Sequence, residues 1–339
     1  MEEKFFKYNS MENTYRTDFI DKVRPYIKPD INQWYITEKI HGCNTQISYD
    51  GKKIEIGKRT GLVQENENFY NAQKVLKPLE DKIKRLYKRI MGYTYGIDKV
   101  IIFGELFGGD YKHPDAPPCK NATKVQKGVY YTPDNNFLAF DIAYTVDENI
   151  YYLSGEVFLA VTEELKIPTV PVLATKLTLS EALEYKNDGE SVVYKMYNLP
   201  KIEGNIMEGV VIKNLLTDLW VGQHRVFFKN KNEKFKEVSH SGKKVVAQID
   251  PKIQEVANKV LAYVTPQRVQ NVMSHMGEVT YEQIGEVLKN VTVDVFEDFE
   301  KDNNDFNTLE KNEIKLVKKT VNPHIVKLVK NILLGGANV

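Results

Sequence analysis

The sequence predicts an α+β protein, in which a domain built on antiparallel sheets is followed by a small all-helical domain. Up to about residue 240, short β-type runs joined by turns alternate with only a few helical segments. Beyond residue 245, apolar residues recur only at helical spacing. A length of 339 residues exceeds the usual single domain. We therefore expect domains at residues 1–242 and 245–339.

The first predicted elements are a strand and a hairpin. The apolar run 34–36 is typical of a strand, and it ends close to Lys39. Residues 45–56 alternate between apolar and polar on both sides of Asp50-Gly51, which favours a tight turn with positive φ at both central residues. The hairpin would then carry Lys39 at its start and Arg59 at its end.

A helix should follow the hairpin, because apolar residues recur at helical spacing through residues 71–91. Pro78 should kink or divide it, since proline disrupts a helix interior. The remaining elements predicted for this domain are strands at 100–106, 137–144, 209–213 and 226–229 and a helix at 155–165. In the second domain, three groups of apolar residues have helical spacing, at 253–264, 269–288 and 314–333.

Composition excludes several classes of protein. A hydrophobic fraction of 42% with mixed charge is typical of a globular chain, and two cysteines cannot build a disulfide framework or a zinc cluster. No run approaches the roughly 20 apolar residues that span a bilayer, and no signal peptide is recognisable, so we expect an intracellular, cytoplasmic protein without membrane contact. A net charge of +1 argues against coating of long polyanions, although residues 221–244 are locally basic.

Candidate functional residues form an ordered series of clusters. The first is Glu38-Lys39-Ile40-His41-Gly42, which places a lysine on a turn beside a carboxylate and an imidazole. Lys-x-x-Gly alone arises often by chance. Five further clusters follow, at 58–61, 103–108, 137–142 and 208–213 and at Lys229 with Lys231.

Lys39 is the candidate nucleophile. Attack on a phosphate requires a neutral amine, and an unperturbed lysine has a pKa of about 10.4, so burial or nearby cations such as Lys229 and Lys231 must lower it. Taken singly, the other residues have ordinary interpretations. Phe140 would be a core aromatic, His41 structural, and Glu105 and Glu208 solvated acids at strand ends.

In this order, the clusters resemble those of the covalent nucleotidyltransferases, which include ATP-dependent polynucleotide ligases and mRNA capping enzymes. The run 38–42 and the run 104–109, with the following Tyr111 and His113-Pro114, look most like RNA ligases of the phage RNA ligase 2 and kinetoplastid RNA-editing types. Residues 7–13 look like the phage-type N-terminus. Residues 262–272 look like the phage-type helical domain, which is associated with the sealing of duplex RNA. The resemblance covers nearly the whole chain.

The resemblance implies a role for each residue. Lys39 would form a phosphoamide with AMP, Glu38 and Ile40 would lie against the nucleotide, and Phe140 would stack on adenine. The other implied contacts are Arg59 and Glu105 to the ribose, His41 and Asn44 to phosphates, Glu208 to a metal ion or the nucleotide, and Lys229 and Lys231 to the α-phosphate. ATP and Mg²⁺ or Mn²⁺ would be required. Family members adenylylate themselves, transfer AMP to an RNA 5′-phosphate, and then join it to a 3′-hydroxyl.

We therefore predict an ATP-dependent RNA ligase with an adenylyltransferase domain at 1–242 and a helical domain at 245–339 that engages nicked duplex RNA. One departure is Cys43, which occupies a place where threonine is expected and should be a packed small residue. DNA ligases and capping enzymes are alternatives. Both usually carry an oligonucleotide-binding barrel after the last lysine cluster, whereas the apolar spacing of this chain predicts helices there. A non-catalytic RNA-binding protein on a ligase scaffold is another. The complete set of Lys39, Glu208, Lys229 and Lys231 argues against it.

Overall fold

A computed structural model describes residues 4–28, 30–235 and 250–333. The chain divides into two compact units, residues 1–234 and 235–339. The boundary predicted at 242–245 lies outside the described residues. No helix among the described ranges is long and apolar enough to cross a membrane.

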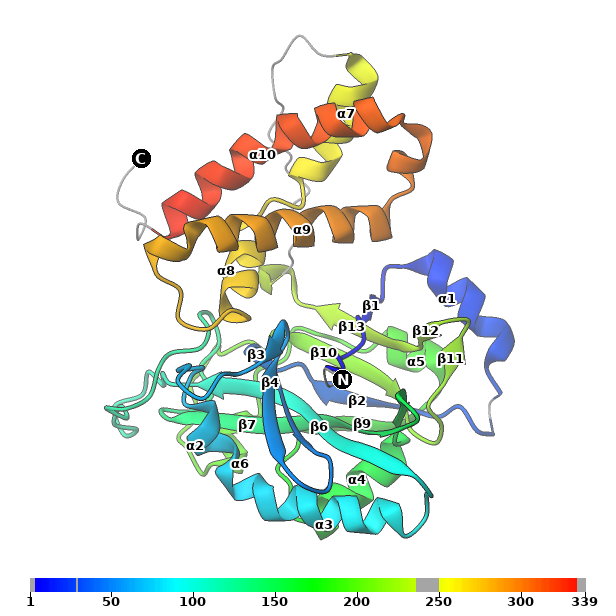
Figure 1. Cartoon of the computed structure of the whole chain (residues 1–339), viewed down its shortest axis with the longest axis vertical. Helices are drawn as coiled ribbons and strands as arrows, with labels where there is room; N and C mark the ends of the chain where they lie inside the picture. Colours follow the sequence, from blue (N-terminus) through cyan, green and yellow to red (C-terminus); the bar gives the residue numbers. More distant parts are fainter. Residues whose placement is uncertain (1–3, 29, 236–249, 334–339) are drawn as a thin grey trace. The chain divides into compact units, whose positions relative to one another are not determined.

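The first unit contains two largely antiparallel sheets (Figure 1). The first sheet has the order β1-β13-β10-β2-β9, with strands β1 (Glu12–Asn13), β13 (Phe227–Lys231), β10 (Gly209–Asn214), β2 (Trp34–Glu38) and β9 (Val172–Leu177). The second has the order β5-β4-β3-β6-β7-β8, with strands β5 (Gly61–Leu62), β4 (Ile54–Lys58), β3 (Cys43–Tyr49), β6 (Ile97–Gly108), β7 (Asn135–Val146) and β8 (Asn149–Tyr152). A small ribbon joins β11 (Trp220–Val221) to β12 (His224–Arg225).

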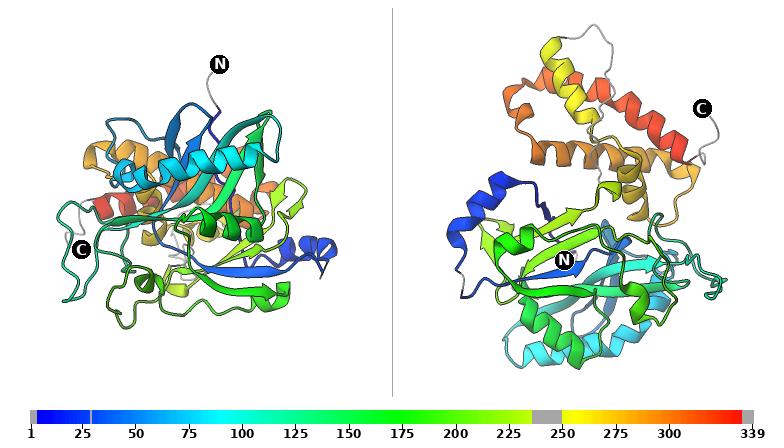
Figure 2. Two further views of the ribbon diagram at one scale, coloured as in Figure 1. Left: turned by 90° about the horizontal axis from the view of Figure 1, so that it is seen from below. Right: turned by 180° about the vertical axis from the view of Figure 1, so that it is seen from behind.

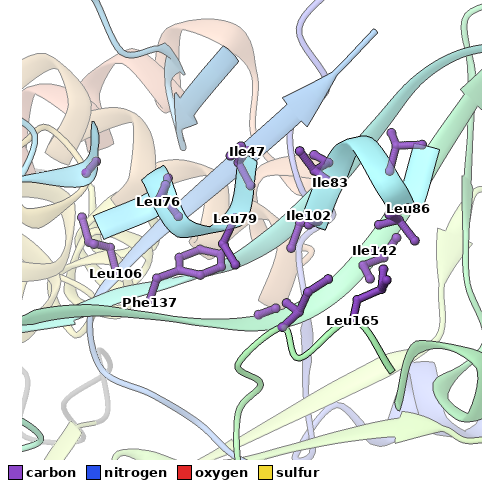
Figure 3. Close-up of a cluster of buried hydrophobic side chains, with 14 of the residues drawn as sticks. Ile47, Leu76, Leu79, Ile83, Leu86, Ile102, Leu106, Phe137, Ile142 and Leu165 are labelled. Atoms are coloured by element: carbon purple, nitrogen blue, oxygen red, sulfur yellow. The ribbon is translucent and has the colours of Figure 1, made fainter. Parts of the chain in front are cut away.

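Helices cover the outer faces of both sheets (Figure 2). They are α1 (Thr17–Val23), α2 (Ala72–Leu76), α3 (Glu80–Met91), α4 (Gly155–Glu164), α5 (Leu179–Leu183) and α6 (Val193–Met196). Figure 3 shows the larger core, in which side chains of α2, α3 and the second sheet interdigitate. A smaller core packs α1 and α5 against the first sheet. A third cluster, which includes Phe103 and Phe227, joins the inner faces of the two sheets.

Most predicted elements of the first unit are confirmed. The helical segment at 71–91 is divided as expected, since Pro78 lies in a 3₁₀ turn between α2 and α3. The prediction of a two-residue turn at Asp50-Gly51 is wrong. The loop spans residues 50–53, only Gly51 has positive φ, and the Asp50 carboxylate accepts hydrogen bonds from the amides of Lys52 and Lys53 at 2.8 and 2.7 Å.

Within the described residues 250–333, the second unit is all-helical, as predicted. Its helices are α7 (Pro251–Leu261), α8 (Pro266–Ser274), α9 (Ile284–Asp302) and α10 (Lys311–Leu333). Asp250 and Thr265 cap α7 and α8, each followed by proline at the first helical position, which needs no backbone N–H there. Valines and isoleucines from these helices form a separate core.

Candidate active site

The candidate nucleophile Lys39 follows β2 on a turn held by both sheets. Its backbone N–H donates to the carbonyl of Gly209 at 2.9 Å, next to β10 in the first sheet. Gly42, at the other end of the turn, lies so close to β6 that a Cβ atom would be 2.2 Å from the Leu106 carbonyl oxygen. Only glycine permits this approach, so the backbone at Gly42 fixes the turn, and with it Lys39, between the sheets.

Two lysines hold the Glu208 carboxylate. The ammonium of Lys39 donates to Oε2 at 2.7 Å, and Lys231 lies 3.1 Å from Oε1. The side chain of Glu208 is 2% exposed and that of Lys39 is 15% exposed. Burial opposes ionisation of this carboxyl, but Lys39 and Lys231 together hold the pKa of Glu208 well below its usual range. The predicted meeting of these clusters in one site is therefore observed, with Glu208 at its centre.

A second carboxylate, Glu105, lies on the other side of Lys39. It accepts a hydrogen bond from the Gly42 amide at 3.1 Å, and Asn44 is its cross-strand neighbour. Burial raises the pKa of Glu105 to about 8, against the lowering effect of the Lys39 charge. The expectation that Glu105 ends its strand is wrong, because β6 continues to Gly108.

A small pocket opens beside Lys39. It is lined by Tyr8, Met11, Thr37, Glu38, Lys39, Ile40, Glu105, Phe140, Val170, Val211 and Lys213. Of the predicted residues, Glu38, Ile40, Glu105 and Phe140 thus share one cavity with Lys39. An aromatic ring, aliphatic side chains and few polar groups are what a flat heteroaromatic base requires.

Glu38 is buried at this pocket. Its Oε2 accepts a hydrogen bond from the Val192 amide at 2.9 Å, whereas Oε1 has no hydrogen-bond partner among the described residues. Burial raises the pKa of Glu38 to about 7, although Ser191 and Val192 oppose the shift. Its carboxyl group can therefore donate or accept a hydrogen bond near neutral pH.

A β-bulge aims Phe140 into the pocket. Gly104 pairs with Ala139 and Phe103 pairs with Asp141, so Phe140 is the extra residue of β7. Ala139 and Ile142 belong to the outer core. Phe140 and Asp141 therefore lie on the inner face in succession, which strict alternation along a strand would not allow.

Asp141 is the centre of a buried ionic cluster that the sequence did not reveal. Its Oδ2 accepts hydrogen bonds from Tyr8 at 2.6 Å, Lys213 at 2.7 Å and Arg225 at 2.6 Å. Although burial opposes ionisation, Arg225 and Lys213 hold the pKa of Asp141 at about 2. Lys213 also donates to the Phe140 carbonyl at 2.6 Å, which secures the bulge from the first sheet.

Several further residues of the site come from unexpected places. Tyr8 and Met11 bring the N-terminal segment to the pocket, because β1 pairs in parallel with β13. The Tyr131 hydroxyl accepts a hydrogen bond from the His41 amide at 2.9 Å. A tyrosine in a loop carries no sequence signal for such a contact.

The remaining predicted residues lie around this centre. His41 Nδ1 is 3.6 Å from Glu208, and Lys229 pairs with Val211, a pocket residue, on the neighbouring strand. Arg59 is exposed just beyond β4. Its positive charge partly opposes the rise that burial causes in the pKa of Glu105. Cys43 is fully buried in the core, as predicted for a packed residue. Lys236, Lys243 and Lys244 of the basic segment lie outside the described residues.

Comparison with known proteins identifies the family. The sequence model described as "RNA ligase" matches residues 32–231, and the one described as "T4 RNA ligase 2 C-terminal" matches residues 246–327. Because the first match covers more than half of the chain, the protein belongs to the RNA ligase family.

Two relatives are RNA-editing ligases of Trypanosoma brucei brucei. The mitochondrial RNA-editing ligase 1 is 28% identical over 243 residues, which cover 62% of this chain and 51% of the relative. RNA-editing ligase 2 is 26% identical over 326 residues, which cover 80% of this chain and 77% of the relative. The chain thus spans about half the length of editing ligase 1. Among solved structures, a Naegleria gruberi RNA ligase variant with ATP and Mn has a TM-score of 0.46 at 17% identity, over 69% of this chain and 58% of that one.

Proposed function

We propose that this protein is an ATP-dependent RNA ligase that seals nicks in duplex RNA through lysyl-AMP and RNA-adenylate intermediates. The observation that carries the proposal is the position of the Lys39 ammonium, which stands between the paired Glu208 and a pocket suited to a purine. Family members react in three steps, which are adenylylation of the enzyme, transfer of AMP to an RNA 5′-phosphate and joining to a 3′-hydroxyl.

In the first step, the Lys39 amine attacks the α-phosphorus of ATP. A P–N bond forms, the bond to the bridging oxygen of pyrophosphate breaks, and an amine proton leaves. The Lys39 nitrogen is engaged by Glu208 at 2.7 Å, so this contact has to open before the nitrogen can approach the α-phosphorus. Lys231, on the other oxygen of Glu208, remains close enough to neutralise charge on the phosphate.

The adenosine would occupy the pocket beside Lys39. Phe140 stacks on the base, and Glu38 offers a hydrogen bond to its edge. The two carboxylates near Lys39 have different tendencies to ionise, because Glu208 is held ionised whereas the pKa of Glu105 is raised to about 8. Glu105 can therefore present a proton to a ribose oxygen.

A divalent ion, Mg²⁺ or Mn²⁺, would neutralise the triphosphate charge. No cluster of three or more histidine, cysteine or acidic side chains that could hold an ion lies within the described ranges. Magnesium in nucleotide sites is usually held by substrate phosphates and one or two carboxylates, which fits Glu208 as the protein ligand once Lys39 has moved away.

Incubation with α-labelled ATP and magnesium, followed by denaturing electrophoresis, tests the proposed class. A label that remains on the denatured chain and disappears on addition of pyrophosphate is expected. An unlabelled chain across a range of pH and metal ions would refute the proposal. Duplex substrates with RNA or DNA at the nick then separate an RNA ligase from a DNA ligase, since we expect sealing only where the strand that supplies the 3′-hydroxyl is RNA.

A further inference from the structure

The longest helix of the second unit, α10, has an exposed row of lysines. Val317, Val321, Ile325 and Val329 are buried at intervals of four residues. Lys315, Lys319 and Lys327 are exposed and lie two residues before Val317, Val321 and Val329, so they are spaced by four and then eight residues, with Pro323 at the position between. At 3.6 residues per turn, two residues correspond to about 200°, so this lysine row lies on the face opposite the core.

Charges in the second unit are segregated by helix. α10 contains six lysines and a single acid, Glu313, whereas α9 contains six acids and two lysines. A helix that is merely solvated usually mixes the two signs, because opposite charges four residues apart stabilise it and like charges destabilise it. Lys315 and Lys319 form such an unfavourable pair.

Structural roles account for only some of these lysines. Lys318 lies over the Phe296 ring at 5.0 Å, and Glu313 is 4.0 Å from Lys252 of α7. The helix dipole favours cations in the last turn, and this accounts for Lys330. No ion pair or hydrogen bond within the described second unit involves the side chains of Lys315, Lys319 or Lys327, so the fold gives no reason for their charge.

We infer that the lysine row of α10 binds the phosphate backbone of duplex RNA without reading its sequence. Four residues of helix rise about 6 Å and eight residues about 12 Å, whereas each strand of a B-form duplex carries one phosphate per roughly 3.4 Å of axis. Lys315 and Lys319 can therefore reach phosphates about two apart, and Lys319 and Lys327 phosphates about three to four apart. A membrane is a poorer partner, because helices that lie on bilayers insert an apolar face, and the apolar face of α10 is already buried in its own core.

This inference rests on the proposed function and identifies the surface by which the second unit would hold the substrate. The test compares the full-length wild type with two triple variants of equal charge loss. One carries Lys315→Gln, Lys319→Gln and Lys327→Gln on α10. The control carries Lys84→Gln, Arg85→Gln and Lys88→Gln on α3, which covers the outer core of the first unit.

Binding of nicked duplex RNA is measured by fluorescence anisotropy between 50 and 200 mM salt, which needs no catalysis. For the α10 variant we expect weaker binding and a logarithmic salt slope that is shallower by about 3, or about 1 for each lost phosphate contact. The α3 variant should keep the wild-type slope. Adenylylation by ATP should be equal in all three proteins, which shows that the first unit is folded, and equal helical circular dichroism shows that the second unit is folded as well.

Three outcomes would overturn the inference: a wild-type slope in the α10 variant, an equal change in both variants, or loss of affinity for phosphatidylserine vesicles with unchanged affinity for RNA. The proposed function fails separately. If the wild type binds duplex RNA with the expected slope but neither takes a label from ATP nor seals nicks, the ligase proposal is wrong and the lysine row remains an RNA-binding surface.

Discussion

At the scale of single residues, the central feature is that one carboxylate, Glu208, is shared by Lys39 and Lys231. The shared anion offsets much of the mutual repulsion of two half-buried ammonium groups and holds Lys39 beside the pocket before substrate arrives. Entry of a triphosphate would replace this anion with phosphate oxygens.

Lys39→Ala should abolish attachment of AMP while leaving the protein folded, because Lys231 remains as a cationic partner of the buried Glu208 carboxylate. Lys39→Arg should fail as well, since arginine stays protonated and cannot act as the nucleophile. The label on the denatured chain measures both, and circular dichroism confirms folding. Labelled Lys39→Ala would mean that another residue is the nucleophile.

Glu208→Ala and Lys229→Ala should each lower the rate of adenylylation by orders of magnitude. Removal of one focused electrostatic contact costs roughly 3 kcal/mol in comparable sites. Lys84→Ala, at a partly exposed position of α3, is the matched control and should behave as wild type. Near-normal rates in both site variants would remove the basis for including these two clusters in the site.

Glu38→Gln should change how stability depends on pH. Burial raises the pKa of Glu38 from 4.5 to about 7, so its contribution to folding is complete below pH 4.5 and is lost as pH rises through 7. The wild type should therefore lose on the order of 3 kcal/mol between pH 4.5 and 8 relative to Glu38→Gln. Urea unfolding of both proteins across this range measures the difference, and parallel curves would show that Glu38 ionises normally in the folded protein.

At the scale of elements, the bulge in β7 and the ionic cluster around Asp141 together orient Phe140. The extra residue turns both Phe140 and Asp141 inward, and Asp141 is bound by Lys213 of the first sheet and by Arg225 of the β11–β12 ribbon. The orientation of the pocket aromatic therefore depends on a tertiary ion pair that crosses from one sheet to the other.

Asp141→Asn should be strongly destabilising, because it leaves the buried Lys213 without its anion and leaves Arg225 with Asp218 alone. Breaking a buried ion pair from one side costs about 3–5 kcal/mol. Lys259→Gln, which removes a half-exposed partner of Asp305, should cost less than about 1 kcal/mol. Urea midpoints compare the two, and equal small losses would show that the Asp141 cluster does not hold the sheets together.

At the scale of the whole molecule, each compact unit has its own core, and the residues placed around Lys39 all lie in the first unit. A fragment ending at residue 242 should therefore still accept AMP from ATP. It should seal nicked duplex RNA poorly, because the lysine row of α10 is removed. Gel assays of adenylylation and sealing test both statements, and a fragment that seals as well as the full chain would remove the main support for duplex engagement by the helical unit.

The sequence by itself determined much of this protein. Helical spacing separated the α10-containing unit from the sheets, and Pro78 marked a true division between α2 and α3. The order of the clusters gave Lys39, Glu208 and Lys231, because the chemistry of phosphate transfer restricts these positions to lysines and acids. Edge elements such as β9, whose residues are largely exposed, carried too little apolar pattern to be predicted.

Only the tertiary structure decided the rest. The ionic cluster around Asp141 joins residues 8, 141, 213 and 225, and no local pattern links positions so far apart in the chain. The bulge at Phe140 depends on pairing with β6, and the raised pKa values of Glu38 and Glu105 depend on burial by both sheets. Local patterns specify strands and helices, whereas register, burial and electrostatic environment arise only when distant segments are packed together.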